Sequence, residues 1–170
     1  MKLLRGLSFI LMSMCAVLAE LPAYAQGYTT SLGVRIGGTS GVSVKHFYKR
    51  STAFEGVLGF FGNGFSVTGL LEKHEDAFDV NGLKFYYGAG AHLSAYENRF
   101  RYYDRVWRDV NYDHQTTIAL GIDGIAGLEY VFDEIPIALS LDLKPFIEVG
   151  SGGFVGFSPD PSIGIKIILR

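Results

Sequence analysis

The sequence predicts an all-β fold, an eight-stranded antiparallel transmembrane β-barrel, and two observations carry this prediction. The first is the segment over residues 118–132, IALGIDGIAGLEYVF, in which every second residue is uncharged and the intervening set holds Asp123, Glu129 and two glycines. A strand separates these two sets because successive side chains point to opposite faces of a sheet, whereas a helix would mix them. The second is that eight such segments follow one another, most of them close to the span of about 9–11 residues that a tilted strand needs to cross a bilayer.

The N-terminus has the layout of a cleaved export signal. A basic start is followed by an apolar run over residues 7–18, which is too short to span a membrane as a helix, and the A-Y-A at 23–25 is a small-residue cleavage site. We therefore expect a signal peptide over residues 1–25 and one outer-membrane β-barrel domain over residues 26–170.

The amino-acid composition limits the possible classes of function. The chain has 170 residues with 22 glycines, 14% aromatic residues and a formal net charge of −2, which suits an all-β product and gives no basic excess for binding nucleic acid. Cys15, the only cysteine, lies inside the expected signal, so the mature chain has no disulfide and no thiolate ligand. The four histidines are scattered over different segments, and neither a metal nor a cofactor is expected.

The first four expected strands combine an apolar face with a polar one. Arg35, Glu55 and Glu72 each oppose the apolar side of their strand, and an Asn-Gly pair marks a tight hairpin between the third and fourth strands. Under strict alternation His46 falls on the apolar face of the second strand, so a bulge or register slip is expected there. These strands cover residues 28–37, 42–48, 53–61 and 65–74.

The last four expected strands keep the same alternation. His92 and Ser94 share the polar face of the fifth, Asp142 and Lys144 that of the seventh, and Lys166 that of the eighth. These strands cover residues 83–96, 118–132, 137–149 and 162–169, and the outer loops between strands fall at 38–41, 63–64, 97–115 and 150–161.

Eight strands match the smallest closed barrel, whose interior is just filled by side chains. Closure removes the open edges that lipid would not tolerate. If both termini lie in the periplasm, Phe60 and Phe65 fall at the outer rim, and an aromatic belt, as expected at a bilayer boundary, forms at the periplasmic ends of the apolar faces. Its members are Tyr28, Tyr48, Phe54, Phe85, Tyr87, Tyr130 and Phe132.

Segments such as SLGVRIGGTSGVSVKHF, YYGAGAHLSAY and GIDGIAGLEYVF resemble the small outer-membrane β-barrel proteins of Bacteroidetes-type bacteria, in the size class of OmpX and OmpA. The resemblance covers essentially the whole mature chain. It implies residence in the cell outer membrane among lipids and lipopolysaccharide, insertion by the barrel assembly machinery and, often, no enzymatic role. Such barrels usually end on an aromatic residue, and here Leu169 and Arg170 stand in its place.

The polar faces would put many ionisable groups inside a narrow lumen, where burial forces them to pair or to lose their charge. We expect a structural charge network that plugs the interior, and a gated ion path is the alternative. Large inward residues, among them Val57, Leu70, Tyr86 and Phe146, favour the plug. The expected network contains Arg35, Lys45, Glu55, Glu72, His92, Asp123, Glu129, Asp142, Lys144 and Lys166, with Glu148 on the same face.

An H-x-S pair on the fifth strand suggests a second function. Lipid A deacylases of the outer membrane use such a pair on a barrel strand, with histidine as base and serine as nucleophile. In this chain His92 and Ser94 would take those roles, and Glu97 or Glu129 would orient the histidine. Ala95 stands where an asparagine usually follows.

The third outer loop, ENRFRYYDRVWRDVNYDHQ, interleaves arginines with aromatics, the residue types that dominate recognition hot spots. It favours contact with an extracellular protein partner, with lipopolysaccharide, or with itself through stacking and Arg–Asp pairs. Because the loop is nearly neutral, nucleic acid is not expected. The candidate binding residues are Arg99, Phe100, Arg101, Tyr102, Tyr103, Arg105, Trp107 and Arg108.

The sequence therefore predicts a non-enzymatic integral outer-membrane barrel of a Gram-negative cell, with a structural or adhesion-like surface-interaction role. Two alternatives stay open. One is the hydrolase that uses His92 and Ser94, and the other is a soluble periplasmic barrel that carries a ligand inside.

Overall fold

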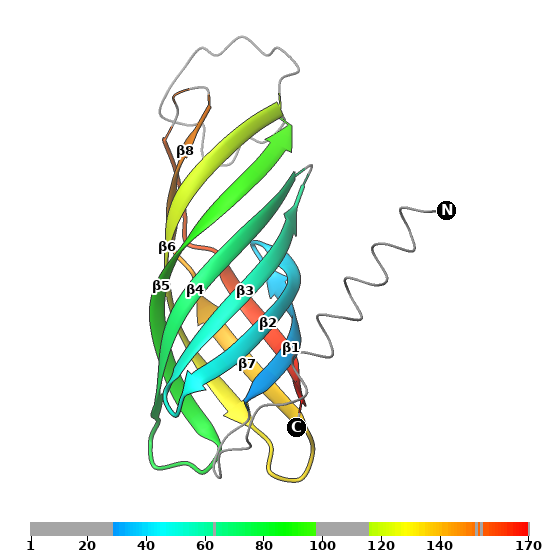
Figure 1. Ribbon diagram of the computed structural model, residues 1–170, viewed down its shortest axis with the longest axis vertical. Coiled ribbons are helices and arrows are strands. Elements are labelled where there is room, and N and C mark those ends of the chain that lie inside the picture. The colour runs from blue at the N-terminus through cyan, green and yellow to red at the C-terminus, as the bar shows by residue number, and fades with distance from the viewer. Residues whose placement is uncertain (1–28, 63, 98–115, 152, 154, 170) are drawn as a thin grey trace, which may run out of the picture.

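The computed structural model describes residues 29–62, 64–97, 116–151, 153 and 155–169. In these residues the chain forms ten strand segments, joined in one antiparallel sheet (Figure 1). The segments are β1 (Thr30–Gly37), β2 (Ser40–Lys49), β3 (Thr52–Phe61), β4 (Gly64–Asp76), β5 (Leu83–Glu97), β6 (Thr116–Val131), β7 (Ile137–Leu143), β8 (Phe146–Gly150), β9 (Val155–Ser158) and β10 (Pro161–Leu169). No helix among the described residues is long and apolar enough to cross a membrane.

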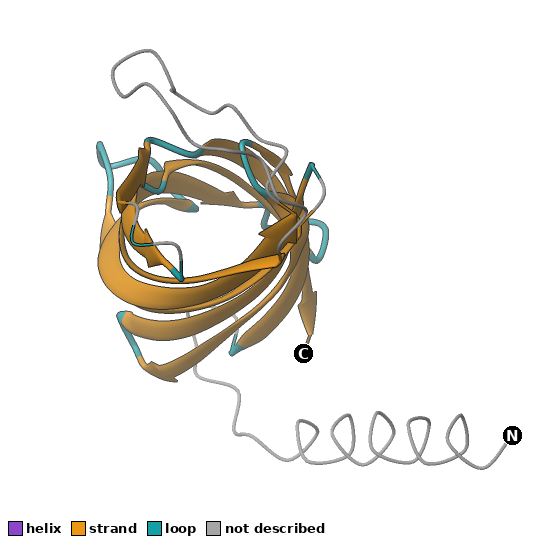
Figure 2. Ribbon diagram, turned by 90° about the horizontal axis from the view of Figure 1, so that it is seen from above, coloured by secondary structure: helices purple, strands orange, loops and turns teal. Residues whose placement is uncertain are grey.

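The sheet closes on itself as an eight-stranded barrel. Each of β1 to β6 pairs with the next in sequence, β6 pairs with both β7 and β8, and β10 returns to pair with β1. β7 and β8 act as one strand interrupted at residues 144–145, and β9 and β10 as another interrupted at 159–160. Viewed from above, the strands enclose a ring (Figure 2), which confirms the predicted fold class.

Two expectations about strand boundaries were wrong. The strand expected over 137–149 is broken at Lys144–Pro145, where proline has no N–H to donate to a ladder. The outer loop expected over 150–161 contains β9, because Val155 and Ser158 pair with β8 in regular antiparallel register. The remaining strands lie within a few residues of their expected bounds.

The barrel is inverted in polarity relative to a soluble protein. Leu120 and Ile122 of β6 are 64% and 68% exposed, whereas Asp123 and Glu129 of the same strand are 4% and 1% exposed. Leu141 of β7 is exposed in the same way. The apolar faces therefore look outward and the ionisable side chains look inward, as membrane-spanning strands require.

Exposed aromatic residues lie near the strand ends, at the two rims of the barrel. The belt at the end that carries the C-terminus contains exposed Tyr48, Phe54, Phe85, Tyr87 and Tyr130, with half-buried Phe132 edge-on to Tyr130 at 4.9 Å between ring centroids. Tyr28, also expected in this belt, lies outside the described residues. At the opposite rim Phe60 and Phe65 are exposed, and Phe157 of β9 joins them.

The irregularity expected at His46 occurs one step later. His46 keeps its place opposite Phe54, with its Nδ1 2.9 Å from the Thr30 hydroxyl, and the register shifts between Phe47 and Lys49. Phe47 lies before the shift, opposite Ala53, and its ring packs edge-on against His74 at 4.7 Å between ring centroids.

Candidate functional site

The lower interior, toward the end that carries the C-terminus, holds a cluster of two lysines among three glutamates. Lys45 of β2 places its Nζ 2.7 Å from Glu72, 3.1 Å from Glu55 and 3.3 Å from Glu129. Lys166 of β10 places its Nζ 2.9 Å from Glu129 and 3.5 Å from Glu55. All five side chains are buried, and five different strands supply them, so this lower cluster ties the wall together across the lumen.

Aromatic rings complete the lower cluster. The Tyr86 ring lies 4.3 Å from the Nζ of Lys45, and a cation over the face of an aromatic ring is attracted by its quadrupole. His74 stacks on Tyr86 at 5.0 Å between ring centroids and places its Nε2 3.2 Å from Glu72. The Tyr86 hydroxyl donates to Asp142 at 2.9 Å, which links the lower cluster to the charges nearer the outer rim.

Inside the barrel an apolar cluster packs next to these charges. Its members are Val57, Leu70, Tyr86 and Ile125, all buried and in mutual contact. These residues come from β3, β4, β5 and β6, on the inward face of each strand. Tyr86 connects this apolar cluster to the charges on both sides, because its ring lies against Lys45 and its hydroxyl donates to Asp142.

Toward the outer rim the pairing of interior charges continues. The Arg35 guanidinium donates to Asp142 and to Ser162, both at 2.7 Å. Lys144, at the break between β7 and β8, contacts Asp123 and Asp160, each at 3.0 Å. The Asp160 carboxylate also accepts the backbone N–H of Thr39 at 2.6 Å, so it fastens the β1–β2 turn to the β9–β10 bend.

His92 forms the core of an upper cluster near the outer rim. Its Nδ1 lies 2.8 Å from Asp123 and its Nε2 3.1 Å from Glu148. The Glu148 carboxylate also accepts the hydroxyls of Ser94 at 3.0 Å and Tyr96 at 3.1 Å. Each ring nitrogen of His92 faces a carboxylate. Because an ionised carboxylate only accepts hydrogen bonds, both ring nitrogens must carry a hydrogen to bond both partners, and this geometry favours the doubly protonated ring.

This arrangement does not match a serine hydrolase. In such an enzyme the serine hydroxyl donates to a neutral histidine that acts as the base, but here the Ser94 hydroxyl donates to Glu148. Glu129, one of the two expected orienting groups, contacts Lys45 and Lys166 in the lower cluster. The pair also faces the interior and not the lipid, with His92 and Ser94 both buried.

The structure places all ten residues of the expected charge network inside the barrel. It adds His74 and Asp160, which the sequence reasoning did not include. His74 shares the strand parity of Glu72, so alternation contained the signal. Asp160 lies in a stretch expected to be a loop, and no pattern pointed to it. Among the described residues no group of three or more His, Cys, Asp or Glu side chains is placed to hold a metal ion.

The expected binding residues of the third outer loop, Arg99 to Arg108, lie outside the described residues. The strands that bracket them are described. β5 and β6 pair from Leu83↔Tyr130 up to Glu97↔Thr116 and rise above the β1–β2 hairpin (Figure 1).

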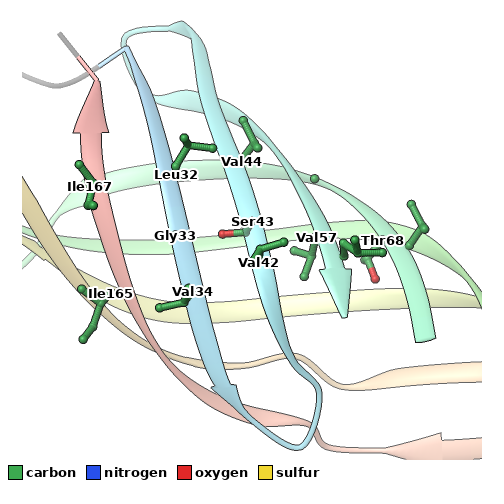
Figure 3. Close-up of a pocket in the computed structure, with 13 residues that line it drawn as sticks. Leu32, Gly33, Val34, Val42, Ser43, Val44, Val57, Thr68, Ile165 and Ile167 are labelled. Atoms are coloured by element: carbon green, nitrogen blue, oxygen red, sulfur yellow. The ribbon is translucent and has the colours of Figure 1, made fainter. Parts of the chain in front are cut away.

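The outer wall has a shallow apolar hollow of about 740 Å³ over β10, β1, β2, β3 and β4 (Figure 3). Leu32 and Val34 of β1, Val44 of β2 and Ile165 and Ile167 of β10 line it. A hollow with so few polar atoms suits the acyl chains of a bilayer, in keeping with the outward direction of the apolar faces.

A closed antiparallel barrel with an apolar exterior, aromatic rims and a charged interior is the architecture of small eight-stranded membrane-spanning β-barrels. The fold is similar to that in the crystal structure of Neisserial surface protein A, with a TM-score of 0.55 over 82% of this chain and 93% of that one. The two sequences are 12% identical, so the likeness extends to the fold alone. No model of a protein family matches the chain, and no curated protein matches its sequence.

Proposed function

We propose that this chain is an integral outer-membrane barrel that carries out no chemistry, has a lumen closed by its own side chains, and acts as a structural or surface-interaction protein. The observation that carries the proposal is the inverted polarity, in which exposed leucines and isoleucines alternate with buried ion pairs. A soluble ligand carrier would instead turn its apolar residues toward the interior.

The contents of the lumen support a plug. Each of the interior cations Arg35, Lys45, Lys144 and Lys166 contacts at least one carboxylate, and the apolar cluster of Val57, Leu70, Tyr86 and Ile125 is buried beside them. An ion path needs continuous water, and closely paired charges packed with buried aliphatic and aromatic groups disfavour it.

The outer membrane is favoured by the expected signal peptide and by the fold shared with a surface protein. There the apolar wall would contact lipids and lipopolysaccharide, and the barrel assembly machinery would insert the chain. Because β5 and β6 rise at the end opposite the C-terminus, the arginine-rich and aromatic segment that joins them would begin outside the cell, where it could meet an extracellular partner.

Fractionation, surface labelling and planar-bilayer recording test the proposal together. The chain should fractionate with outer membranes, and Tyr102→Cys should react with an impermeant maleimide on intact cells. The purified barrel should give no stepwise current. Recovery in the soluble periplasm would contradict the location, and ohmic current steps from the unmodified chain would contradict the closed lumen.

A lipid A mass spectrum tests the enzymatic alternative. Cells that express Ser94→Ala should give the same acyl pattern as cells that express the unmodified chain, because Ser94 serves as a hydrogen-bond donor to Glu148. If a deacylated lipid A species were lost only in the variant, the result would support the hydrolase function and contradict the proposal.

A further inference from the structure

Two connections at the end that carries the C-terminus are joined into one surface. They are residues 77–82 between β4 and β5 and residues 132–136 between β6 and β7. The Asn81 side-chain amide donates to the Asp133 carboxylate at 2.8 Å, and the Val131 N–H donates to the Gly82 carbonyl at 2.8 Å. We call this surface the 77–82/132–136 platform. It lies at the opposite end from the outer loops of the proposed function.

The backbone of the platform is held in a conformation that its residues disfavour. Phe78 and Asp79 have φ of 55° and 53°, in the left-handed region that is uncommon for an aromatic residue. Hydrogen bonds from Val80 N–H to the Ala77 carbonyl, and from Ala77 N–H to the Leu83 carbonyl, both at 3.1 Å, fix the turn. Strain of this kind persists only where the surrounding structure enforces it, and it is concentrated at functional sites.

The platform also exposes apolar side chains. Phe78 is 81% exposed, Val80 on the same turn is exposed, and so is Ile135 in the second connection. An aromatic residue this open, on a fixed turn that also exposes an aliphatic one, is a surface that gains from being covered.

The same two connections also carry carboxylates. Asp79, Asp133 and Glu134 are all exposed, and no ion pair involves Asp79 or Glu134 in the part of the chain that the structure describes. The other carboxylates nearby are already paired, Glu75 with Lys73 at 2.8 Å and Asp76 with Lys84 at 2.5 Å. The platform is therefore acidic as well as apolar.

The position and charge of the platform disfavour lipid as its cover. The aromatic belt residues Phe85, Tyr130 and Phe132 mark the bilayer boundary, and Phe78, Asp79, Val80 and Glu134 lie in the connections beyond the strand ends that carry the belt. A loop that anchors in a membrane carries Lys or Arg toward the lipid phosphates, whereas Asp79 and Glu134 would be repelled by them.

We infer that the 77–82/132–136 platform is a docking surface for a protein segment that presents an apolar side chain next to Lys or Arg. The apolar side chain would cover Phe78 and Val80, and the basic group would meet Asp79 and Glu134. The partner would bind from the periplasmic side of the membrane, at the end that carries the C-terminus. Docking at this surface goes beyond the proposed function, which concerns the interior and the outer loops.

Peptide binding to the full mature chain in nanodiscs of zwitterionic lipid tests the inference. The probe is a short labelled peptide of alternating leucine and lysine, with a leucine–glutamate peptide as its counterpart. We expect saturable binding of the basic peptide only. Phe78→Asn should weaken it about tenfold while keeping the barrel folded, because asparagine tolerates the left-handed region.

Two further variants complete the design. Asp79→Asn with Glu134→Gln should weaken binding and reduce its dependence on salt, because screened charge pairs are lost. Ser51→Asn, on the β2–β3 turn at the same end, is the matched control and should leave binding unchanged. Equal affinity for the two peptides, an undiminished affinity in Phe78→Asn, or no saturable binding up to about 1 mM overturns the inference.

A spin label attached at Phe78→Cys distinguishes docking of a protein segment from insertion of this residue into lipid. Relaxation by a water-soluble nickel chelate places this residue in water and supports docking. Relaxation by oxygen alone places it in the bilayer and overturns the inference, while leaving the proposed function intact.

Discussion

Lys45 is the residue on which the interior charge balance depends most directly. Its ammonium lies between Glu55, Glu72 and Glu129, and burial makes removal of one partner from such a group far more costly than the pairing itself is favourable. Lys73, in contrast, pairs with Glu75 at the exposed rim, where water screens the interaction.

Lys45→Met should therefore destabilise the barrel by about 3–5 kcal/mol, because three carboxylates lose their shared cation inside a low-dielectric lumen. Urea unfolding in detergent, followed by tryptophan fluorescence or by gel mobility, measures the change. Lys73→Met is the matched control and should unfold like the unmodified chain. An unchanged midpoint for Lys45→Met would show that the lower cluster is hydrated and not buried.

Asp160 combines strain with pairing. It has φ of +39° and holds both Lys144 and the Thr39 N–H. Asp160→Asn keeps a residue that tolerates this φ and a side-chain acceptor for Thr39, whereas Asp160→Ala keeps neither.

We expect Asp160→Ala to lower the free energy of unfolding by about 3 kcal/mol or more, and Asp160→Asn to lower it by less. Denaturant midpoints of the two variants check the order. The reverse order would mean that Asp160 does not fasten the β1–β2 turn.

At the scale of the element, β6 shows how one strand serves two environments. Gly121 faces the lumen, and a Cβ there would collide with the His92 ring and the Ile147 carbonyl. Gly124 faces outward, and a Cβ there would make only ordinary contacts with Pro145, the nearest at 3.7 Å. The two glycines lie three residues apart on one strand, so they form a matched pair.

Gly121→Ala should destabilise the barrel by about 1–3 kcal/mol through overpacking and should disturb the His92 contacts with Asp123 and Glu148. Gly124→Ala should be close to neutral. The temperature at which each variant loses the compact, faster-migrating form on an electrophoresis gel measures the two stabilities. The NMR signals of His92 report the local change. Equal tolerance of the two alanines would contradict the inward assignment of Gly121.

Alternation predicted the elements well because period-2 polarity follows directly from strand geometry. It correctly assigned Lys144 and Glu148 to one face of the seventh strand, since that parity continues through the break at Pro145. It did not locate the break, because polarity does not report which backbone groups are hydrogen-bonded. β9 was missed because Pro159 and the glycines around it read as a loop, although Val155 and Phe157 alternate with Gly156 and Ser158.

At the scale of the whole molecule, the sequence indicated which side chains enter the lumen but not which of them meet. Arg35 and Asp142 are 107 positions apart, and Lys45 and Glu129 are 84 apart. These contacts depend on how far the closing pairing of β1 with β10 is staggered, and side-chain patterns do not specify that stagger.

A closed barrel should resist detergent. Because every strand of the wall has a neighbour on both sides over most of its length, the unheated chain in sodium dodecyl sulfate should run as a compact form that shifts on boiling. Identical migration of heated and unheated samples would contradict closure.

The most direct test of the central claim is the accessibility of spin labels on single cysteines in lipid bilayers. The expected cleavage of the signal removes Cys15, so labels can be placed at Leu120 and Leu141 on the outer face and at Ser66 and Ser140 on the inner face. We predict strong relaxation by oxygen at the two outer sites and protection from oxygen at the two inner sites. Oxygen contact at Ser66 and Ser140, together with protection at Leu120 and Leu141, would contradict the account.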